Sequence, residues 1–293
     1  MNAAAMGVRP ACEEMDEAGY RRWMRLIQER TGLFIPPERK GFLSAGIRER
    51  MRASGCADAE QYFERMRDLR THADEWSLLI DRLTVHETRF FRHAPSFELV
   101  QHVFLPQVCR LGLPHLQVWS VGCATGEEAY SLAILMERQR QAEGCPPSYG
   151  VTGTDISLPA LREARVGRYP LRRLQGVPEA LRDRFFHIDA QGGQVDQAVR
   201  ARTAFFQLNL MDLARYPLRD FHLIFCQNVL IYFERSLRLR FLSQLAERLA
   251  PGGMLVLGPG EVPVWSHDGM ERVAYEGTLA FRRLEPAEEE GKE

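Results

Sequence analysis

The fold of this chain is decided by one stretch of sequence, which reads Val118-Trp119-Ser120-Val121-Gly122-Cys123-Ala124-Thr125-Gly126-Glu127-Glu128. It begins with four residues of strand character, continues through a Gly-x-x-x-Gly turn, and leads into residues that repeat with helical spacing. A strand, a glycine turn and a helix open a nucleotide-binding α/β unit, because glycine admits a ligand that a Cβ atom would exclude. We therefore expect a cofactor site at this turn; the alternative is a tight connection without a ligand.

The glycine spacing and the two acids after it argue against a dinucleotide. The turn does not read G-x-G-x-x-G, and Glu127 and Glu128 occupy the helix start, where a pyrophosphate would bind free N–H groups. A ligand with a cationic centre and no phosphate suits such a turn better. S-adenosylmethionine (SAM), a sulfonium that carries an adenosine, is therefore the expected cofactor.

Length and composition set the outer bounds. The chain has 293 residues, 45% of them hydrophobic, which is enough for one large core or two modest ones. No run approaches the ~20 apolar residues of a membrane span, and no secretory signal is visible, so we expect a cytoplasmic protein. Six cysteines without a C-x-x-C pair predict neither disulfides nor a metal site, and a net charge of −1 gives no general attraction to nucleic acid.

Residues 16–95 are expected to form a small all-α domain, preceded by a disordered segment at 1–15. Apolar residues recur at helical spacing in four groups. They are Tyr20, Trp23, Met24 and Ile27; Leu43, Ile47 and Met51; Tyr62, Phe63, Met66 and Leu69; and Trp76, Leu79, Ile80 and Leu83.

Residues 96–284 are expected to form an α/β domain, followed by an acidic tail at 285–293. Strand patterns alternate with helical ones, which predicts parallel strands joined by right-handed crossovers. The predicted strands after the glycine turn are Val151–Asp155, Phe205–Leu208, Phe221–Phe225, Met254–Leu257 and a hairpin of Val273–Tyr275 with Thr278–Phe281. Helices begin near Pro159 and Arg235, and the second is expected to end at Pro251-Gly252-Gly253. Because ligands bind such sheets at the carboxyl ends of strands, Gly122–Glu128, Asp155 and Cys226–Asn228 should lie together.

One segment, at about 183–204, interrupts the alternation. It contains Phe185–Ile188, a turn at Gln191-Gly192-Gly193, and Val195–Val199, which together predict an antiparallel hairpin at the edge of the sheet. As an edge addition, it should be removable without unfolding the core. The pattern alone leaves open whether the hairpin is decoration or binds a partner.

Five motifs occur in a characteristic order: Thr84–Arg92, Gly122–Ser131, Gly153–Ile156, Ala164–Tyr169 and Cys226–Phe233. Together they resemble the CheR-type chemoreceptor glutamate methyltransferases, over about residues 20–281. The resemblance implies an N-terminal helical domain, a Rossmann-like SAM-dependent methyltransferase domain and an inserted β-subdomain that contacts receptors. It also implies O-methylation of glutamate side chains on a chemoreceptor, with S-adenosylhomocysteine as product, for adaptation in a chemosensory or twitching-motility pathway.

Residue by residue, the resemblance assigns cofactor binding to His86, Thr88, Arg92, Gly122, Glu128, Asp155, Asn209, Leu210, Gln227 and Asn228. It gives catalytic roles to Arg92, which steers the accepting carboxylate, and to Tyr232, which forms a hydrogen bond near the sulfonium or the substrate. Asp155 ends a strand where an acid would accept hydrogen bonds from ribose hydroxyls. The alternatives are a helix N-cap for Asp155, a surface ion pair for Arg92 and ordinary core packing for Tyr232.

Some positions depart from the family pattern. Family members have Asn where His86 stands, Pro where Ala129 stands, Arg where Gln227 stands, and His-Ser-Glu where Pro259-Gly260-Glu261 lies. His86 can still donate one hydrogen bond, and Gln227 can bond adenine without a charge. Such departures suit a paralogue that serves another chemosensory array, for example the type IV pilus branch known as PilK.

The expected partner is the cytoplasmic helical domain of a chemoreceptor, bound by a monomer through the β-subdomain and the basic N-terminal domain. Residues 20–52 hold nine Arg/Lys against three Asp/Glu, which suits acidic receptor helices, although a solvated helix face would have the same composition. Neither nucleic acid nor membrane insertion is expected. Two other functions remain open: a SAM-dependent methyltransferase acting on RNA or a small carboxylic acid, and a SAM-binding module that has lost turnover.

Overall fold

The computed structural model describes residues 15–262 and 265–285. The chain divides into two compact units, Met1–Leu83 and Thr84–Glu293. The boundary falls after Leu83, earlier than the predicted boundary at residues 95 and 96, so the motif Thr84–Arg92 belongs to the second unit. The predicted disordered segment and acidic tail lie outside the described residues, except for Met15 and Glu285.

The first unit is all-α, as predicted. Its elements are α1 Glu17–Thr31, η1 Pro37–Arg39, α2 Lys40–Ala53, α3 Ala59–Arg67 and α4 Leu69–Leu83. Asp16 caps α1 by accepting a hydrogen bond from the Gly19 amide, and Gly32 ends the helix in the left-handed conformation. The Trp23 ring packs against Tyr62 and Phe63 in the core, with centroid distances of 5.8 and 4.9 Å.

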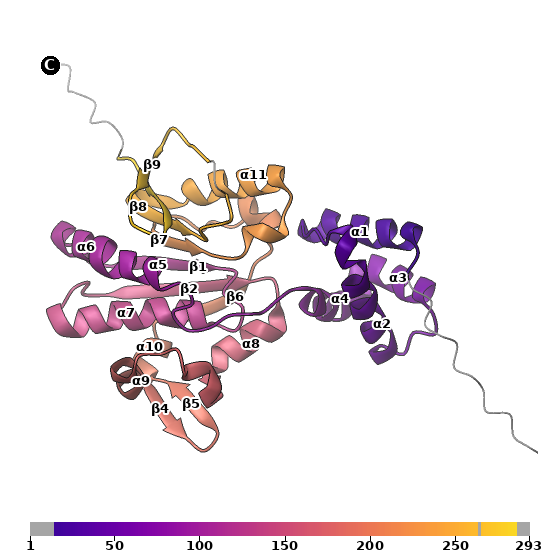
Figure 1. The fold of residues 1–293 in the computed structure, drawn as a ribbon, viewed down its shortest axis with the longest axis horizontal. Helices are drawn as coiled ribbons and strands as arrows, with labels where there is room; N and C mark the ends of the chain where they lie inside the picture. Colours follow the sequence, from indigo (N-terminus) through magenta and orange to yellow (C-terminus); the bar gives the residue numbers. More distant parts are fainter. Residues whose placement is uncertain (1–14, 263–264, 286–293) are drawn as a thin grey trace, which may run out of the picture. The chain divides into compact units, whose positions relative to one another are not determined.

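The second unit is built on a seven-stranded sheet with the order β6-β2-β1-β7-β8-β10-β9 (Figure 1). Its strands are β1 Leu116–Val121, β2 Tyr149–Asp155, β6 Thr203–Gln207, β7 Phe221–Cys226, β8 Leu249–Leu257, β9 Met270–Val273 and β10 Leu279–Arg283. Strands β1, β2, β6, β7 and β8 are parallel, and β10 and β9 close the sheet as an antiparallel hairpin. The chain leaves β1 toward β2 on one side and returns to β7 on the other, so the switch point that binds ligands in such sheets lies between β1 and β7.

Helices connect the parallel strands and pack on them. The second unit contains α5 Ala94–Leu99, η2 Val100–Phe104, α6 Leu105–Leu111, α7 Glu127–Glu143, α8 Leu158–Val166, η4 Leu210–Arg215, η5 Leu230–Tyr232 and α11 Arg235–Ala246. Helix α7 packs on β1 and β2, α8 on β2 and β6, and α11 on β8. None of the helices in the described part of the chain is long and apolar enough to cross a membrane.

The predicted inserted subdomain is present, but it is larger than the predicted hairpin. A three-stranded antiparallel sheet has the order β3-β5-β4 and includes Arg168–Tyr169, a strand that the sequence pattern did not indicate. The other elements are β4 Phe186–Asp189, β5 Gly192–Val195, η3 Leu171–Leu174, α9 Glu179–Phe185 and α10 Gln197–Arg200. Gly192 and Gly193 therefore lie in a strand rather than in the turn, and the predicted strand Val195–Val199 is wrong because α10 begins there.

The prediction that this insertion is a removable edge addition is also wrong. Phe186, Val195 and Val199 are buried in the same hydrophobic core as β1 and α7. The Phe90 ring contacts Tyr169 and Phe186 edge-on, with centroid distances of 5.0 and 5.2 Å. Deletion of 183–204 would thus open the core and remove the start of β6.

Two further predictions need correction. Helix α11 ends at Ala246, and Pro251-Gly252-Gly253 lie inside β8, where the pairing with β7 shifts register. Gly252 has a φ of 72°, a left-handed conformation that glycine adopts at β-bulges as well as at helix ends. The sequence predicted no disulfide, yet Cys109 at the end of α6 is bonded to Cys145.

Candidate functional site

The glycine loop Gly122–Glu128 joins β1 to α7 at the switch point of the sheet. Gly122 has a φ of 69°, and a Cβ atom added to it would lie 2.3 Å from Cγ2 of Val229. This contact arises because β1 and β7 run side by side and Val121 pairs with Cys226. Glycine is therefore required at position 122 both for its backbone conformation and for its lack of a side chain.

Asp155, at the carboxyl end of β2, fixes this loop. Its Oδ2 accepts a hydrogen bond of 2.8 Å from the Ala124 amide, and its Oδ1 accepts one of 2.9 Å from the Ser157 amide. The N-cap of α8 is Ser157, whose hydroxyl accepts from the Ala160 amide. Burial raises the pKa of Asp155, while the two amides and the nearby His86 oppose that shift. The carboxylate is therefore engaged with backbone, and further acceptor capacity remains on its oxygens.

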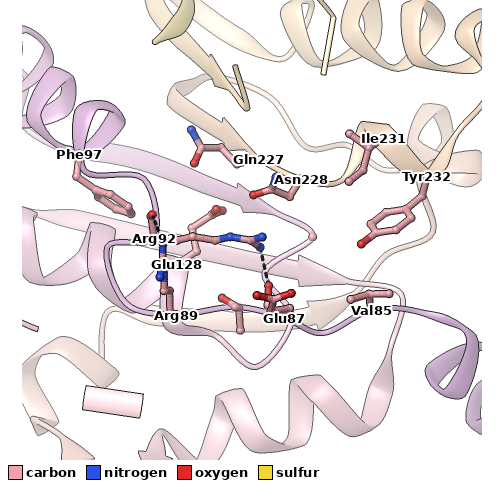
Figure 2. Close-up of a pocket in the computed structure, with 13 residues that line it drawn as sticks. Val85, Glu87, Arg89, Arg92, Phe97, Glu128, Gln227, Asn228, Ile231 and Tyr232 are labelled. Atoms are coloured by element: carbon pink, nitrogen blue, oxygen red, sulfur yellow. Dashed lines mark hydrogen bonds between the residues drawn. The ribbon is translucent and has the colours of Figure 1, made fainter. Parts of the chain in front are cut away.

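A cavity of about 620 Å³, open to solvent, lies at the carboxyl ends of β1 and β7. Figure 2 shows side chains from three separate segments converging on it. The lining residues are Val85, Glu87, Thr88, Arg89, Arg92, Phe97, Gly122, Ala124, Glu128, Gln227, Asn228, Ile231 and Tyr232.

Arg92 reaches the cavity because the preceding backbone is anchored to α7. The Phe91 amide donates a 3.0 Å hydrogen bond to the Ser131 hydroxyl, and Phe91 has a φ of 51°. Arg92 donates from Nη1 to the Glu87 carbonyl at 2.6 Å, as drawn in Figure 2. Among the described residues Arg92 forms no ion pair within 4.0 Å, so the surface-pair alternative receives no support. The guanidinium thus lines the cavity while one of its edges is held by backbone.

Glu128 provides an acid at the start of α7. Its Oε1 accepts a 2.7 Å hydrogen bond from the Ser120 hydroxyl at the end of β1. Burial raises the pKa of Glu128 to about 8, and the neighbouring Glu261 carboxylate adds to the shift, whereas Ser120 and Arg92 oppose it. A cationic group entering the cavity would favour the ionised carboxylate.

The segment Gln227–Tyr232 follows β7 and forms another side of the cavity. Asn228 has a φ of 59°, which places its side chain at the cavity on a left-handed turn. The turn is held by Glu261, whose carboxylate accepts from the amides of Val229 at 2.6 Å, Leu230 at 2.9 Å and Gly258 at 2.8 Å.

Gln227 and Tyr232, the other two predicted site residues of this segment, differ in their contacts. Gln227 donates to the Ser96 hydroxyl at 2.7 Å and to the Leu257 carbonyl, so its amide nitrogen is engaged with protein. Tyr232 is half-buried, and its hydroxyl points toward the cavity in Figure 2. It lines the cavity rather than packing in the core.

The cavity brings together seven predicted site residues and leaves four outside its lining. Those together are Thr88, Arg92, Gly122, Glu128, Gln227, Asn228 and Tyr232. The four that do not line it are His86, Asp155, Asn209 and Leu210. His86 contacts the Thr84 hydroxyl at 3.0 Å and lies near Asp155, and Asn209 caps η4 by accepting from the Met211 amide. Sequence reasoning missed the positioning role of Glu261, although an acid shortly after the predicted strand Met254–Leu257 was a signal for it.

These residues fit SAM. The Glu128 carboxylate suits a cationic amino group, and the Asn228 amide can donate and accept. Within the described part of the chain, no group of three or more His, Cys, Asp or Glu side chains is arranged to hold a metal ion.

Comparison with known proteins identifies the family. Residues 18–84 match the CheR methyltransferase all-alpha domain, and residues 86–276 match the CheR methyltransferase SAM-binding domain. The chain is 31% identical over 263 residues to a chemotaxis protein methyltransferase of Vibrio parahaemolyticus, an alignment that covers 87% of this chain and 92% of that protein.

It is also 31% identical over 268 residues to the probable biofilm formation methyltransferase WspC of Pseudomonas putida, which covers 90% of this chain and 61% of that protein. The chain therefore spans about three fifths of the length of the WspC relatives. The two matched domains correspond to the two compact units, and the cofactor of the second is SAM. This chain belongs to the CheR methyltransferase family.

Proposed function

We propose that this chain transfers the methyl group of SAM to glutamate side chains of a chemoreceptor. The observation that carries the proposal is the joint lining of one cavity by Arg92, the glycine loop and Tyr232, on the fold of a family whose relatives are named chemotaxis protein methyltransferases. The relatives named WspC support a chemosensory pathway in the broad sense. Flagellar chemotaxis, biofilm formation and twitching motility are the alternative settings for such a pathway.

The contribution of the protein to this reaction is to position the reacting groups. When bound, SAM supplies a methyl group that a carboxylate oxygen attacks in line, so that an O–CH₃ bond forms as the S–CH₃ bond breaks. A free glutamate has a pKa of about 4.3, so it is already ionised at neutral pH and needs no general base. Arg92 is the residue that would orient this carboxylate, and Tyr232 would hold the reacting groups from the opposite wall. Orientation of this kind contributes at most about 7–11 kcal/mol to a barrier.

Incubation with tritiated SAM and membranes that carry the cognate receptor tests the proposal. We expect label on the receptor that is released by mild base, because methyl esters hydrolyse there and N-methyl groups do not. Label on RNA alone would replace the proposal with the RNA methyltransferase alternative. Cofactor binding without label on any acceptor would leave a binding module.

The raised pKa of Glu128 gives a pH-dependent prediction. In the free protein Glu128 is mainly protonated below about pH 8, and it must lose that proton to pair with the cofactor's ammonium. We expect the affinity for S-adenosylhomocysteine to rise between pH 6 and 8, by at most about tenfold per pH unit. Calorimetry in buffers of different ionisation heat should detect proton release. Glu128→Gln should bind more weakly with no such pH dependence; an equal slope in this variant would exclude Glu128 as the source.

We propose the inserted subdomain as a receptor-docking surface. Large apolar side chains are exposed on and beside it: Val166 is 57% exposed, Leu171 53% and Ile188 48%. Ile188→Ser should lower the rate of receptor methylation and leave the affinity for S-adenosylhomocysteine unchanged. Leu111→Ser is the matched control, because Leu111 is 57% exposed on α6, outside the subdomain. Equal receptor methylation by both variants would move docking away from this surface.

The basic N-terminal unit is the second proposed receptor surface. Arg21 and Arg25 line a groove with Phe63 and form no ion pair within residues 15–262 and 265–285, so their charge is available to an acidic helix. Arg50, in contrast, is paired with Glu75 at 2.7 Å in a mostly buried bridge, and charge reversal there would damage the fold. Charge reversal at Arg21 and Arg25 therefore tests this surface without breaking an ion pair of the fold.

A further inference from the structure

The inserted subdomain contacts the glycine loop at residues 125–127 through two side chains. Tyr169 of β3 is 1% exposed and donates a 2.7 Å hydrogen bond to the Thr125 carbonyl. Its hydroxyl also limits the space beside Gly126, where an added Cβ atom would lie 3.1 Å from it. The loop is therefore held at Thr125 and Gly126, which do not line the cavity but directly follow the cavity-lining residue Ala124.

Arg173 of η3 makes the second connection. Its Nη1 lies 3.2 Å from the Thr125 hydroxyl and 3.2 Å from Oε1 of Glu127. Glu127 is fully buried, and its other oxygen accepts a 2.7 Å hydrogen bond from the Thr125 hydroxyl. Arg173 is thus the cation that accompanies a buried carboxylate in the loop, and removal of one partner of a buried pair leaves the other charge uncompensated.

We propose that Tyr169 and Arg173 are positioning residues for the cofactor loop, so that the inserted subdomain takes part in cofactor binding without touching the cofactor. This inference rests on the proposed function for the location of the cofactor, and it adds a role for two residues that line no part of the cavity. Residues 125–127 connect Ala124 to Glu128, and both of these residues line the cavity. A displacement of residues 125–127 therefore moves Ala124 and Glu128 as well.

Tyr169 and Arg173 hold different parts of the loop. Tyr169 holds the loop at the Thr125 carbonyl, and Arg173 holds the first turn of α7 at the Glu127 carboxylate. Burial raises the pKa of Glu127 and the Glu163 carboxylate on α8 adds to the shift, whereas the Thr125 hydroxyl and Arg173 oppose it. Without Arg173 the carboxylate would bind a proton or draw in water, and either change alters the hydrogen bond from Thr125.

Equilibrium binding of S-adenosylhomocysteine, measured by calorimetry, tests this proposal in the full chain. Arg173→Ala and Tyr169→Phe should each weaken binding by about fivefold to a hundredfold, the range for one buried polar partner left unpaired. Arg172→Ala is the matched control, because Arg172 is exposed on the same short helix and should bind like the wild type. The affinity of Arg173→Ala should also become more dependent on pH as Glu127 titrates.

A double variant separates positioning from general damage. Glu127→Gln with Arg173→Ala removes both charges, and it should recover most of the lost affinity and lose the added pH dependence. If Arg173→Ala does not fold, Tyr169→Phe, which keeps the ring, provides the test. Wild-type affinity in folded Tyr169→Phe and Arg173→Ala would overturn the proposal. Because binding is measured without receptor, a wild type that binds the ligand but methylates no receptor would refute the proposed function and leave this inference standing.

Discussion

Replacement of Gly122 by Ala is expected to abolish detectable binding of S-adenosylhomocysteine and to lower the free energy of unfolding. The added Cβ atom would lie 2.3 Å from Val229 Cγ2, so either the glycine loop or the turn after β7 must move. The φ of 69° adds backbone strain of about 1–3 kcal/mol. Both segments line the cavity, and a displacement of either one disrupts it.

Gly112→Ala is the control that introduces backbone strain without a steric clash. Gly112 has a φ of 62°, but an added Cβ atom there would meet nothing within 4 Å. We expect Gly112→Ala to lose some stability and to bind normally. Val229→Ala added to Gly122→Ala should restore part of the binding, since it removes the colliding methyl groups. Normal binding by Gly122→Ala alone would mean that the cofactor does not depend on this loop.

Arg92→Ala is expected to lower kcat with receptor by roughly a hundredfold, the loss that a small misplacement of reacting groups can cause. The affinity for S-adenosylhomocysteine should fall much less, because Arg92 is proposed to act mainly on the accepting carboxylate. Steady-state kinetics with receptor membranes, together with calorimetry, separate the two quantities.

Arg92→Lys is the control for charge. Lysine keeps a cation but lacks the planar fork of the guanidinium, so a partial recovery of kcat would identify electrostatic steering, and no recovery would identify geometry. A proportional loss of kcat and affinity in Arg92→Ala would instead assign Arg92 to the cofactor alone.

The sequence predicted the parts of the fold that are local. The strand, turn and helix around Gly122 follow from apolar pattern and glycine spacing, and the structure confirms them as β1, the loop and α7. The order of alternating strands and helices predicted the parallel sheet for the same reason. It also predicted that the ends of β1 and β7 lie together, which is where the cavity forms.

The features that were missed depend on contacts between distant segments. Strand β3 has two residues and exists because Arg168 and Tyr169 pair with β5, which carries no local signal. Cys109 and Cys145 meet because tertiary packing brings the end of α6 close to the loop after α7. Pro251-Gly252-Gly253 is typical of a helix end, and only the pairing with β7 makes it a bulge.

The same reason explains which contacts at the site the sequence did not indicate. Asp155 stays a predicted ribose acceptor, and the structure adds that its carboxylate is bound to two amides, one of which belongs to the glycine loop. Glu261 holds three amides around the turn at Asn228, a role that depends on the way β8 brings it back beside β7. Backbone amides are invisible to a motif, so the residues that position the site are harder to predict than those that line it.

The most direct test of the central claim is peptide-resolved mass spectrometry of a receptor's cytoplasmic domain after reaction with this chain and SAM. We expect the mass of one methylene on specific glutamate residues, absent after mild base and absent when Gly122→Ala replaces the wild type. Methyl groups on lysine or arginine, or no modified peptide from an enzyme that binds S-adenosylhomocysteine, would contradict the assignment of this cavity to glutamate methylation.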